Sequence, residues 1–374
     1  MQPPSTLPDR VWLPTWAQRA LIALSTTAIL LPAVDMAWGI DPTPPPAENR
    51  NLAEWPPLTL GIAALQRWPG LFEGWQRDHF GLRSTLIHWH SVLMLDVLGV
   101  SPRADVVLGK AGWLFLGTNK ALDAYRCIFP FTPAALASEV AGARTRDSYL
   151  KTLGIRHMDV WAPLKHNVYP EFLPAWIQKS GGPCRFDQLR EAFAKAHLPF
   201  TDLRPAMAAA KRQGLAYHRT DTHWNARGAF FGYSAIAREL SRSFKDFVPL
   251  PPERVRFVEV QRPGGDLARQ LDLVQRYAGP EVVAQILAPA CRRVQPSATR
   301  PKGVKLEAFD CDNGGPRVLM FADSYGNALI PFLAESAGHL LAVEFGGFDK
   351  ELIALEKPDV VIDVRVERQM QPDR

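Results

Sequence analysis

Several signatures that assign a function at sight are missing from this sequence of 374 residues. None of its four cysteines has CxxC spacing, so zinc-ribbon and thioredoxin-like interpretations lack support. No GxxxxGK(S/T) motif occurs, so the glycines around Lys110 do not form a phosphate-binding loop. Lysine and arginine form no long run and the net charge is only +5, which makes nucleic acid a poor candidate as a partner.

Metal-ligand spacing is missing as well. His88 and His90 stand two residues apart in a segment whose apolar residues recur every three or four positions. A helix would direct these two side chains to different faces. We therefore expect the histidines to pack or to lie on the surface, and we expect the protein to need neither a metal ion nor another cofactor.

The four cysteines are Cys127, Cys184, Cys291 and Cys311. An even number outside the cytosol would suit two disulfides, for which three pairings exist. We favour Cys291–Cys311, which closes one short segment, and Cys127–Cys184 by elimination. Free buried thiols are the alternative, and the cysteines alone do not decide between the two states.

An uncharged apolar run near the N-terminus predicts a membrane anchor. Residues 20–34 carry no charge, and a spanning helix of roughly 20 residues is reached only if it extends to Ile40 with Asp35 at the outer interface. Trp38 would then be an interfacial anchor. Arginines precede the run and acidic residues follow it, which places 1–19 in the cytoplasm and the remainder outside.

A proline-rich stretch at 41–57 follows the apolar run and is predicted to be a tether. Such a tether disfavours a buried soluble helix over 20–40. No clear small-x-small cleavage site is present, so we expect an uncleaved signal anchor in the inner membrane, with a removed signal peptide as the alternative. The resulting periplasmic location favours disulfides over free thiols.

Apolar strands that alternate with helical segments predict an α/β fold, with a mostly parallel sheet covered by helices on both faces. The apolar content of 47% suffices for a sizeable core, and we place the domain at 58–368, before a polar tail at 369–374. Residues 262–316 hold turn-forming residues and two cysteines and are predicted to be a surface insertion. The expected strands are 156–163, 198–203, 255–260, 317–321, 339–345 and 359–366.

Two short sequences carry the candidate chemistry. Asp221 and His223 are two apart in YHRTDTHWN, so an extended segment would project both side chains from one face. A carboxylate beside an imidazole fixes its tautomer and stabilises the imidazolium. Ser324 follows the apolar strand RVLMF in a short turn, where α/β sheets expose nucleophiles. We predict that the three meet as a Ser-His-Asp triad; a hydrogen-bonded core pair and a helix N-cap serine are the alternatives.

These motifs resemble those of the AlgJ/AlgX family, which are exported, SGNH hydrolase-like O-acetyltransferases of bacterial exopolysaccharides such as alginate. The resemblance spans roughly 58–368 and rests on YHRTDTHWN, the strand that ends in Asp-Ser-Tyr, the predicted hairpin VVLGKAGWLFLG, the VYPE stretch and the closing DVVIDVRVER. It implies a three-layer αβα domain with a catalytic triad of Asp221, His223 and Ser324. Ala322 stands where SGNH enzymes usually carry glycine. The chain ends soon after the domain, which favours the AlgJ branch.

The resemblance implies O-acetyl transfer from an acetyl donor to a secreted polysaccharide through an acetyl-serine intermediate. It also implies a membrane-bound O-acyltransferase and other polysaccharide secretion proteins as partners. Two alternatives remain: an extracytoplasmic carbohydrate acetylesterase with the same triad, and a non-catalytic scaffold of a secretion complex. The candidate oxyanion donors are the backbone N–H of Ser324 or Tyr325 and the side chain of Asn327.

Three further residues are candidates for gripping a sugar or a carboxylate: Lys165, Tyr169 and Arg365. Each also has a purely structural alternative. Lys165 would then be a solvated strand end and Tyr169 a packed ring. Arg365 would form an ion pair with a carboxylate such as Asp363 or Glu367.

Overall fold

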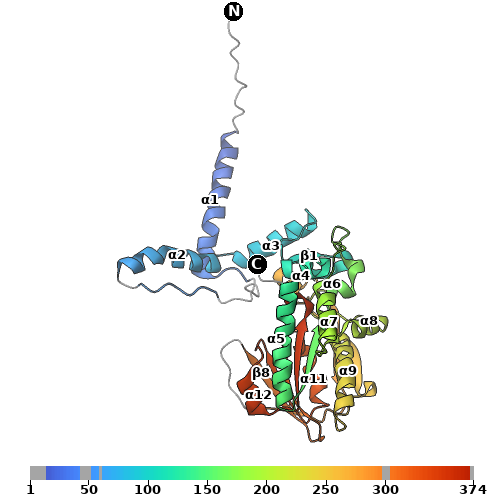
Figure 1. The fold of residues 1–374 in the computed structure, drawn as a ribbon. Coiled ribbons are helices and arrows are strands. Elements are labelled where there is room, and N and C mark those ends of the chain that lie inside the picture. The colour runs from blue at the N-terminus through green and yellow to red at the C-terminus, as the bar shows by residue number, and fades with distance from the viewer. Residues whose placement is uncertain (1–13, 43–51, 59–60, 297–303, 371–374) are drawn as a thin grey trace, which may run out of the picture. The chain divides into compact units, whose positions relative to one another are not determined.

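The computed structural model describes residues 14–42, 52–58, 61–296 and 304–370 (Figure 1). Most of the predicted cytoplasmic tail and tether, and the end of the polar tail, lie outside these ranges. The chain forms two compact units, 1–102 and 103–374. The second unit therefore begins well after Leu58, where we expected the domain to start.

The described part of the first unit contains three helices, α1 (Thr15–Trp38), α2 (Ile62–His79) and α3 (Arg83–Asp96). Among the described residues, α1 is the one helix long and apolar enough to cross a membrane. Gly81, between α2 and α3, lies so close to α1 that a Cβ there would sit 1.9 Å from the Pro32 carbonyl oxygen. The two helices that we assigned to the domain from 58 onward thus pack with the apolar helix in one unit.

The second unit is built on a seven-stranded sheet. Its first five strands in sheet order are parallel, and the last two are added in antiparallel fashion. In sheet order the strands are β4 (Thr201–Asp202), β3 (Arg156–Ala162), β11 (Val360–Val366), β9 (Arg317–Ala322), β10 (His339–Glu344), β8 (Lys305–Asp310) and β7 (Arg292–Val294).

Helices cover both faces of this sheet, as the alternation in β9 requires. Val318 and Met320 join the core under α8, α9 and α11, whereas Leu319 and Phe321 join the core under α5 and α12. The predicted three-layer αβα fold is confirmed. The α-helices are α4 (Asn119–Arg126), α5 (Pro133–Thr152), α6 (Lys165–Val168), α7 (Arg185–Lys195), α8 (Arg204–Arg212), α9 (Ala226–Ser243), α10 (Asp266–Gln270), α11 (Ile330–Ala334) and α12 (Lys350–Glu356), and the 3₁₀ helices are η1 (Lys110–Gly112), η2 (Pro170–Phe172), η3 (Pro252–Arg254), η4 (Gly326–Ala328) and η5 (Glu367–Met370).

Two small antiparallel sheets accompany the large one. The predicted hairpin is confirmed as β1 (Val106–Leu108) paired with β2 (Leu114–Leu116). The predicted strand 255–260 exists as β5 (Val255–Arg262), but it pairs with β6 (Gly279–Ile286) outside the main sheet. The segment 262–316 is more than a surface insertion, because it supplies α10, β6 and the two antiparallel strands β7 and β8.

Both favoured disulfides are present. Cys127 is joined to Cys184, and Cys291 is joined to Cys311, so all four cysteines are paired. The shorter loop encloses β7 and β8 and holds them against each other at the antiparallel edge of the large sheet. Closing a loop limits the conformations of the unfolded chain and so stabilises the fold.

The turn after β9 depends on a close backbone approach at Gly326. A Cβ at this position would lie 2.2 Å from the Cβ of Ala322, and 3.5 Å from the Cε of Met320. Gly326→Ala should therefore lower the free energy of unfolding by about 1–3 kcal/mol, because overpacking forces the turn to shift. Urea denaturation measures this loss. Gly347→Ala is the matched control, since nothing lies within 4 Å of its Cβ position; equal stability of the two variants would contradict the prediction.

Candidate active site

The segment that carries Asp221 and His223 is a bent loop rather than the extended strand we expected. An isolated bridge between Tyr217 and Trp224 closes its two ends. Asp221 Oδ1 accepts hydrogen bonds from the backbone N–H of His223 at 2.9 Å and from its ring Nδ1 at 2.7 Å. Because both bonds go to one oxygen, the carboxylate holds the ring orientation and keeps the proton on Nδ1.

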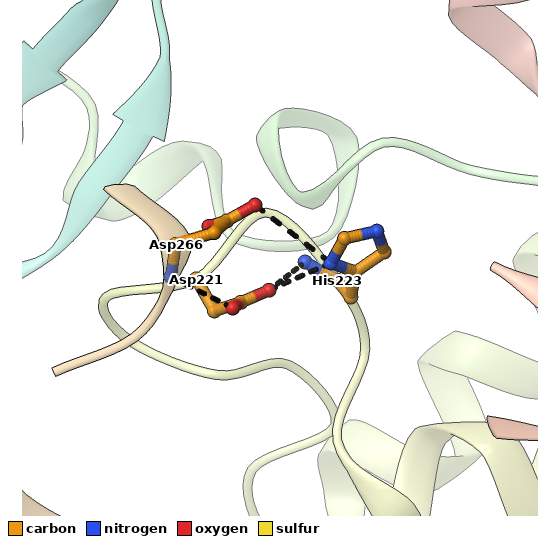
Figure 2. Close-up of side chains that lie close together, drawn as sticks. All are labelled: Asp221, His223 and Asp266. Carbon is orange, nitrogen blue, oxygen red and sulfur yellow. Dashed lines mark hydrogen bonds and ion pairs between the residues drawn. The ribbon is translucent and has the colours of Figure 1, made fainter. Parts of the chain in front are cut away.

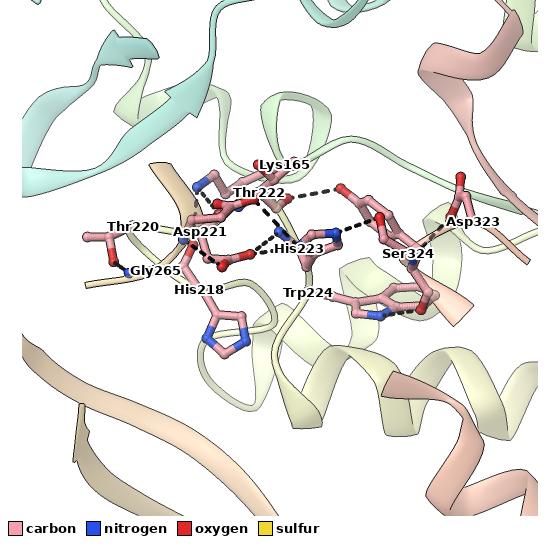
Figure 3. A network of polar contacts seen from close by, with 12 residues as sticks. Lys165, His218, Thr220, Asp221, Thr222, His223, Trp224, Gly265, Asp323 and Ser324 are labelled. Atoms are coloured by element: carbon pink, nitrogen blue, oxygen red, sulfur yellow. Dashed lines mark hydrogen bonds and ion pairs between the residues drawn. The ribbon is translucent and has the colours of Figure 1, made fainter. Parts of the chain in front are cut away.

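Ser324 lies in the turn directly after β9, at the carboxyl end of the parallel strands. Buried Asp323 clamps this turn: its Oδ1 accepts from Tyr325 N and its Oδ2 accepts from Val366 N, both at 2.9 Å. Ser324 Oγ lies 2.8 Å from His223 Nε2 (Figure 3). The turn is thus tied to β11 on one side and points the hydroxyl at the imidazole on the other.

The structure brings Asp221, His223 and Ser324 together as one continuous hydrogen-bonded chain. Its members come from segments 101 residues apart. The side chains of His223 and Asp221 are 29% and 22% exposed, and Ser324 is partly exposed, so the chain is open to a reactant rather than sealed in the core. That these residues catalyse a reaction remains a prediction.

A second carboxylate, which the sequence interpretation missed, lies beside the histidine. Asp266 Oδ2 is 3.9 Å from His223 Nδ1 (Figure 2). Its Oδ1 accepts from Thr222 N at 2.7 Å, and its own N–H donates to Asp221 Oδ2 at 2.9 Å. The turn-forming residues around Asp266 gave no sign of this contact, because it depends on α10 folding back onto the loop.

These neighbours set the charge of the site. Burial lowers the pKa of His223, but the hydrogen bond and charge of Asp221, assisted by the charge of Asp266, outweigh burial and raise it above its ordinary value. Burial raises the pKa of Asp221, yet the hydrogen bonds and charge of His223 bring it below its ordinary value. Asp221 therefore stays ionised and can stabilise an imidazolium.

If His223 acts as a general base, Asp266→Asn should shift the pH dependence of the activity. A general base must be neutral, so activity rises with pH through the raised pKa of His223. Removing the Asp266 charge lowers that pKa, and the acidic limb of kcat/KM should move to lower pH by roughly one unit. The asparagine oxygen can still accept from Thr222 N. Asp312→Asn, at an exposed position, makes the same change in net charge and should leave the acidic limb of kcat/KM unmoved. An unmoved acidic limb in Asp266→Asn would contradict the claim that the Asp266 charge raises the pKa of His223.

Lys165 does not lie where a sugar could reach it. It is 1% exposed, and its Nζ donates to the carbonyl oxygens of Asp221 at 2.6 Å, His218 at 3.2 Å and Arg219 at 3.3 Å. Burial lowers the pKa of Lys165 to about 7, although the charge of Asp221 opposes this shift. Lys165 therefore does not bind a substrate but holds the loop that carries Asp221 and His223.

Tyr169 and Arg365 are engaged inside the fold as well. Tyr169 is 2% exposed; its OH accepts from Ala216 N at 2.8 Å and its ring packs on Trp113. Arg365 donates from Nη2 to both oxygens of Asp159 at 2.6 Å, so its ion pair is with this residue of the neighbouring strand and not with either acid we named. Burial closes Tyr169 to a sugar, whereas Arg365, 29% exposed, is already paired with Asp159.

The candidate oxyanion donors differ in whether they are free to bind. Tyr325 is fully buried: its N–H is used by Asp323, and its OH donates to the Thr222 carbonyl at 3.0 Å. Its ring packs 5.0 Å from the ring of His223. Asn327 is exposed on η4. Tyr325 thus packs against the His223 ring and helps to fix its position.

Asp221, His223 and Asp266 offer nitrogen and oxygen atoms within 4.8 Å of one another, a spacing that a metal ion would also fit. The carboxylate oxygens of Asp221 and Asp266, however, already accept hydrogen bonds within the protein. Asp221 accepts from His223 and from the Asp266 amide, and Asp266 accepts from the Thr222 amide. This arrangement favours a braced imidazole over a ligand set, and the need for no metal remains an expectation.

The fold is that of an SGNH hydrolase-like α/β domain. Residues 106–341 match the family described as "SGNH hydrolase-like domain, acetyltransferase AlgX", and the chain belongs to this family. The family resemblance deduced from the motifs is therefore confirmed.

Three similar proteins illustrate the relationship. The chain is 31% identical over 156 residues, 42% of its length and 37% of the relative's, to "Probable alginate O-acetylase AlgJ" of Pseudomonas syringae pv. tomato. It is 27% identical over 238 residues, 60% of its length and 56% of the relative's, to the protein of the same name from Pseudomonas aeruginosa. The structure of Bacillus cereus PatB1 shares the fold, with a TM-score of 0.50, 16% identity and coverage of 72% of this chain and 98% of that one. The chain spans about a third to just over half of the curated relatives' length.

Proposed function

We propose that this protein is an extracytoplasmic O-acetyltransferase that acetylates hydroxyl groups of an exopolysaccharide through an acetyl-Ser324 intermediate. The observation that carries the proposal is the hydrogen bond between Ser324 Oγ and His223 Nε2, in an imidazole braced by Asp221, within a family described as acetyltransferases. A serine beside a base that is itself oriented by a third group is the arrangement that activates a weak nucleophile.

The reaction proceeds in two halves. In the first, His223 Nε2 takes the Ser324 proton while Oγ attacks the carbonyl carbon of an acetyl ester or thioester. The donor's C–O or C–S bond then breaks, and the proton passes from His223 to the leaving alcohol or thiol. In the second half, His223 takes the proton of a sugar hydroxyl, whose oxygen attacks the acetyl carbon. The bond to Ser324 Oγ breaks, and Oγ regains the proton from the imidazolium.

The oxyanion formed in each half requires donors. Because the Tyr325 N–H is already given to Asp323, the backbone N–H of Ser324 is the first candidate. The exposed Asn327 side chain, on the 3₁₀ turn that follows, is the second. A donor on the nucleophile's own turn needs no movement to meet the developing charge.

The acceptor is proposed by analogy with the relatives, and the partners are proposed from the resemblance to the AlgJ/AlgX family. The curated relatives are named alginate O-acetylases, so an alginate-type polysaccharide is the proposed acceptor. A membrane-bound O-acyltransferase that passes acetyl groups across the bilayer is the proposed supplier, and other secretion proteins are proposed neighbours. The apolar helix α1 is proposed as the anchor that holds the catalytic unit at the periplasmic side of the inner membrane.

An assay with an acetylated donor and candidate oligosaccharides tests this function. We expect acetylated sugar to form, free acetate to remain the minor product, and a chelator to leave the rate unchanged. Free acetate at the same rate with and without acceptor would identify an acetylesterase instead. Normal acetylation of the polymer in cells that carry Ser324→Ala, His223→Ala or Asp221→Ala would point to a scaffold.

A further inference from the structure

An apolar stripe is exposed along α3 and the turn that follows it. Its members are spaced by three or four residues, so they lie on one face of the helical path. They are Leu86 (50% exposed), Trp89 (63%), Leu93 (52%), Val97 (70%) and Val100 (46%). A helix of a water-soluble domain normally turns such a stripe toward its core.

The opposite face of α3 is partly covered. Ser91 is 3% exposed, and Thr85 Oγ1, on the flank, donates to Asp41 Oδ1 at 2.9 Å. The most exposed large side chains of α3 are therefore apolar, whereas the residue that this helix buries is the small polar Ser91. This inversion is the pattern of a surface that meets an apolar medium rather than water.

The start of α3 is fixed to the end of α1. Gly81 leaves no room for a side chain against the Pro32 carbonyl, and Leu82 N donates to Asp35 Oδ2 at 2.7 Å. Asp35 also accepts from Asp41 N at 2.7 Å. Figure 1 shows that α2 and α3 run across the direction of α1 instead of continuing it.

We propose that α3 lies in the outer boundary layer of the membrane, with its apolar stripe between lipid headgroups and acyl chains. The proposal rests on the proposed function of α1 as an anchor. An acidic residue such as Asp35 belongs at the water-facing end of a spanning helix. The turn between α2 and α3 is hydrogen-bonded to Asp35 and is therefore held at the level of the headgroups. Trp89 is of the residue type that favours this layer.

Basic residues beside the apolar stripe are also consistent with contact to a phospholipid membrane. Arg77 and Arg83 line one groove with the apolar side chains of Phe80 and Leu86. Glu73 lines the same groove, 3.9 Å from Arg77, so one of the two positive charges is offset and the groove keeps a net positive charge. Phospholipids present negative headgroups directly above apolar chains, so this pairing of charge and apolar surface matches a bilayer boundary better than a protein core.

Nitroxide accessibility tests the proposal on the full chain in nanodiscs of phosphatidylethanolamine and phosphatidylglycerol. All native cysteines are paired, so a single introduced cysteine is the one labelled site. Leu86→Cys and Leu93→Cys probe the stripe, Leu24→Cys probes α1, and Gln213→Cys, on an exposed turn, is the aqueous reference. The collision rates of each label with oxygen and with a water-soluble nickel complex are compared.

We expect the oxygen-to-nickel collision ratio at both stripe positions to exceed the aqueous reference several-fold and to stay below that of Leu24→Cys. A stripe ratio equal to the aqueous reference would overturn the proposal, because the stripe would face water. Low collision rates with both reagents would also overturn it, because a protein surface would cover the stripe. An aqueous ratio at Leu24→Cys would instead reject the anchor, and the boundary placement would fail with it.

Discussion

Acetyl transfer by the Ser324→Ala protein will fall by about 10⁴-fold or more in kcat, because no nucleophile remains to form the acetyl-enzyme. The hydroxyl oxygen lies 2.8 Å from Nε2 of the imidazole, where it can give up its proton. Steady-state rates with a soluble acetyl donor measure the loss.

The loss must come from chemistry and not from misfolding. Ser324 is partly exposed, so alanine leaves no large cavity, and the urea midpoint should stay near that of the wild type. His223→Ala should lose about as much activity, and the double variant no more than either one, since the two residues act as a unit. Additive losses would mean that Ser324 and His223 do not act in one step.

Lys165→Met will lower the free energy of unfolding by about 2–5 kcal/mol and will also reduce activity. The ammonium group satisfies three carbonyl oxygens of the loop that ends in Asp221. Methionine fills the same space with an apolar thioether, so these buried acceptors lose their donor, and the loop loses the contact that fixes the Asp221 backbone.

Urea denaturation and kcat, measured together, check this prediction. Lys195→Met, at an exposed position on α7, removes the same charge without removing buried hydrogen bonds and should cost little. If Lys165→Met were as stable and active as the control, the hydrogen bonds from Lys165 to the loop would be unnecessary.

Much of the fold could be predicted from local pattern. The apolar run in β9 and the near-continuous run in β11 indicate strands buried on both faces, and the observed bounds differ from the expected ones by about a residue. Asn225 is of a residue type that favours the start of a helix, and its side chain caps α9 by accepting from Arg227 N and Gly228 N. Where local chemistry decides the structure, the sequence is sufficient.

Which distant segments of the chain pair or contact each other could not be predicted in this way. The strand at 255–260 was correct as a strand, but its partner β6 and its place outside the main sheet depend on contacts with a segment that looked like loop. Asp266 was missed for the same reason, because a short turn gives no sign that its side chain will fold back beside His223.

The candidate site was predicted by residue type more than by geometry. Asp221 and His223 do converge, but through a bent loop in which one carboxylate oxygen accepts two bonds, and not through the alternation of a strand. Lys165 was expected either to bind a sugar or carboxylate or to be a solvated strand end, since lysine is seldom buried unless paired. Three carbonyl acceptors explain why this lysine is an exception.

The covalent intermediate is the most direct test of the central claim. The full-length protein is mixed with a slow acetyl ester, quenched in acid and digested, and the acetylated peptide is located by mass spectrometry. We predict one acetyl group on Ser324 in the wild type and none at that position in His223→Ala. Acetylation at another residue, or equal labelling of Ser324 with and without the histidine, would contradict the proposed mechanism.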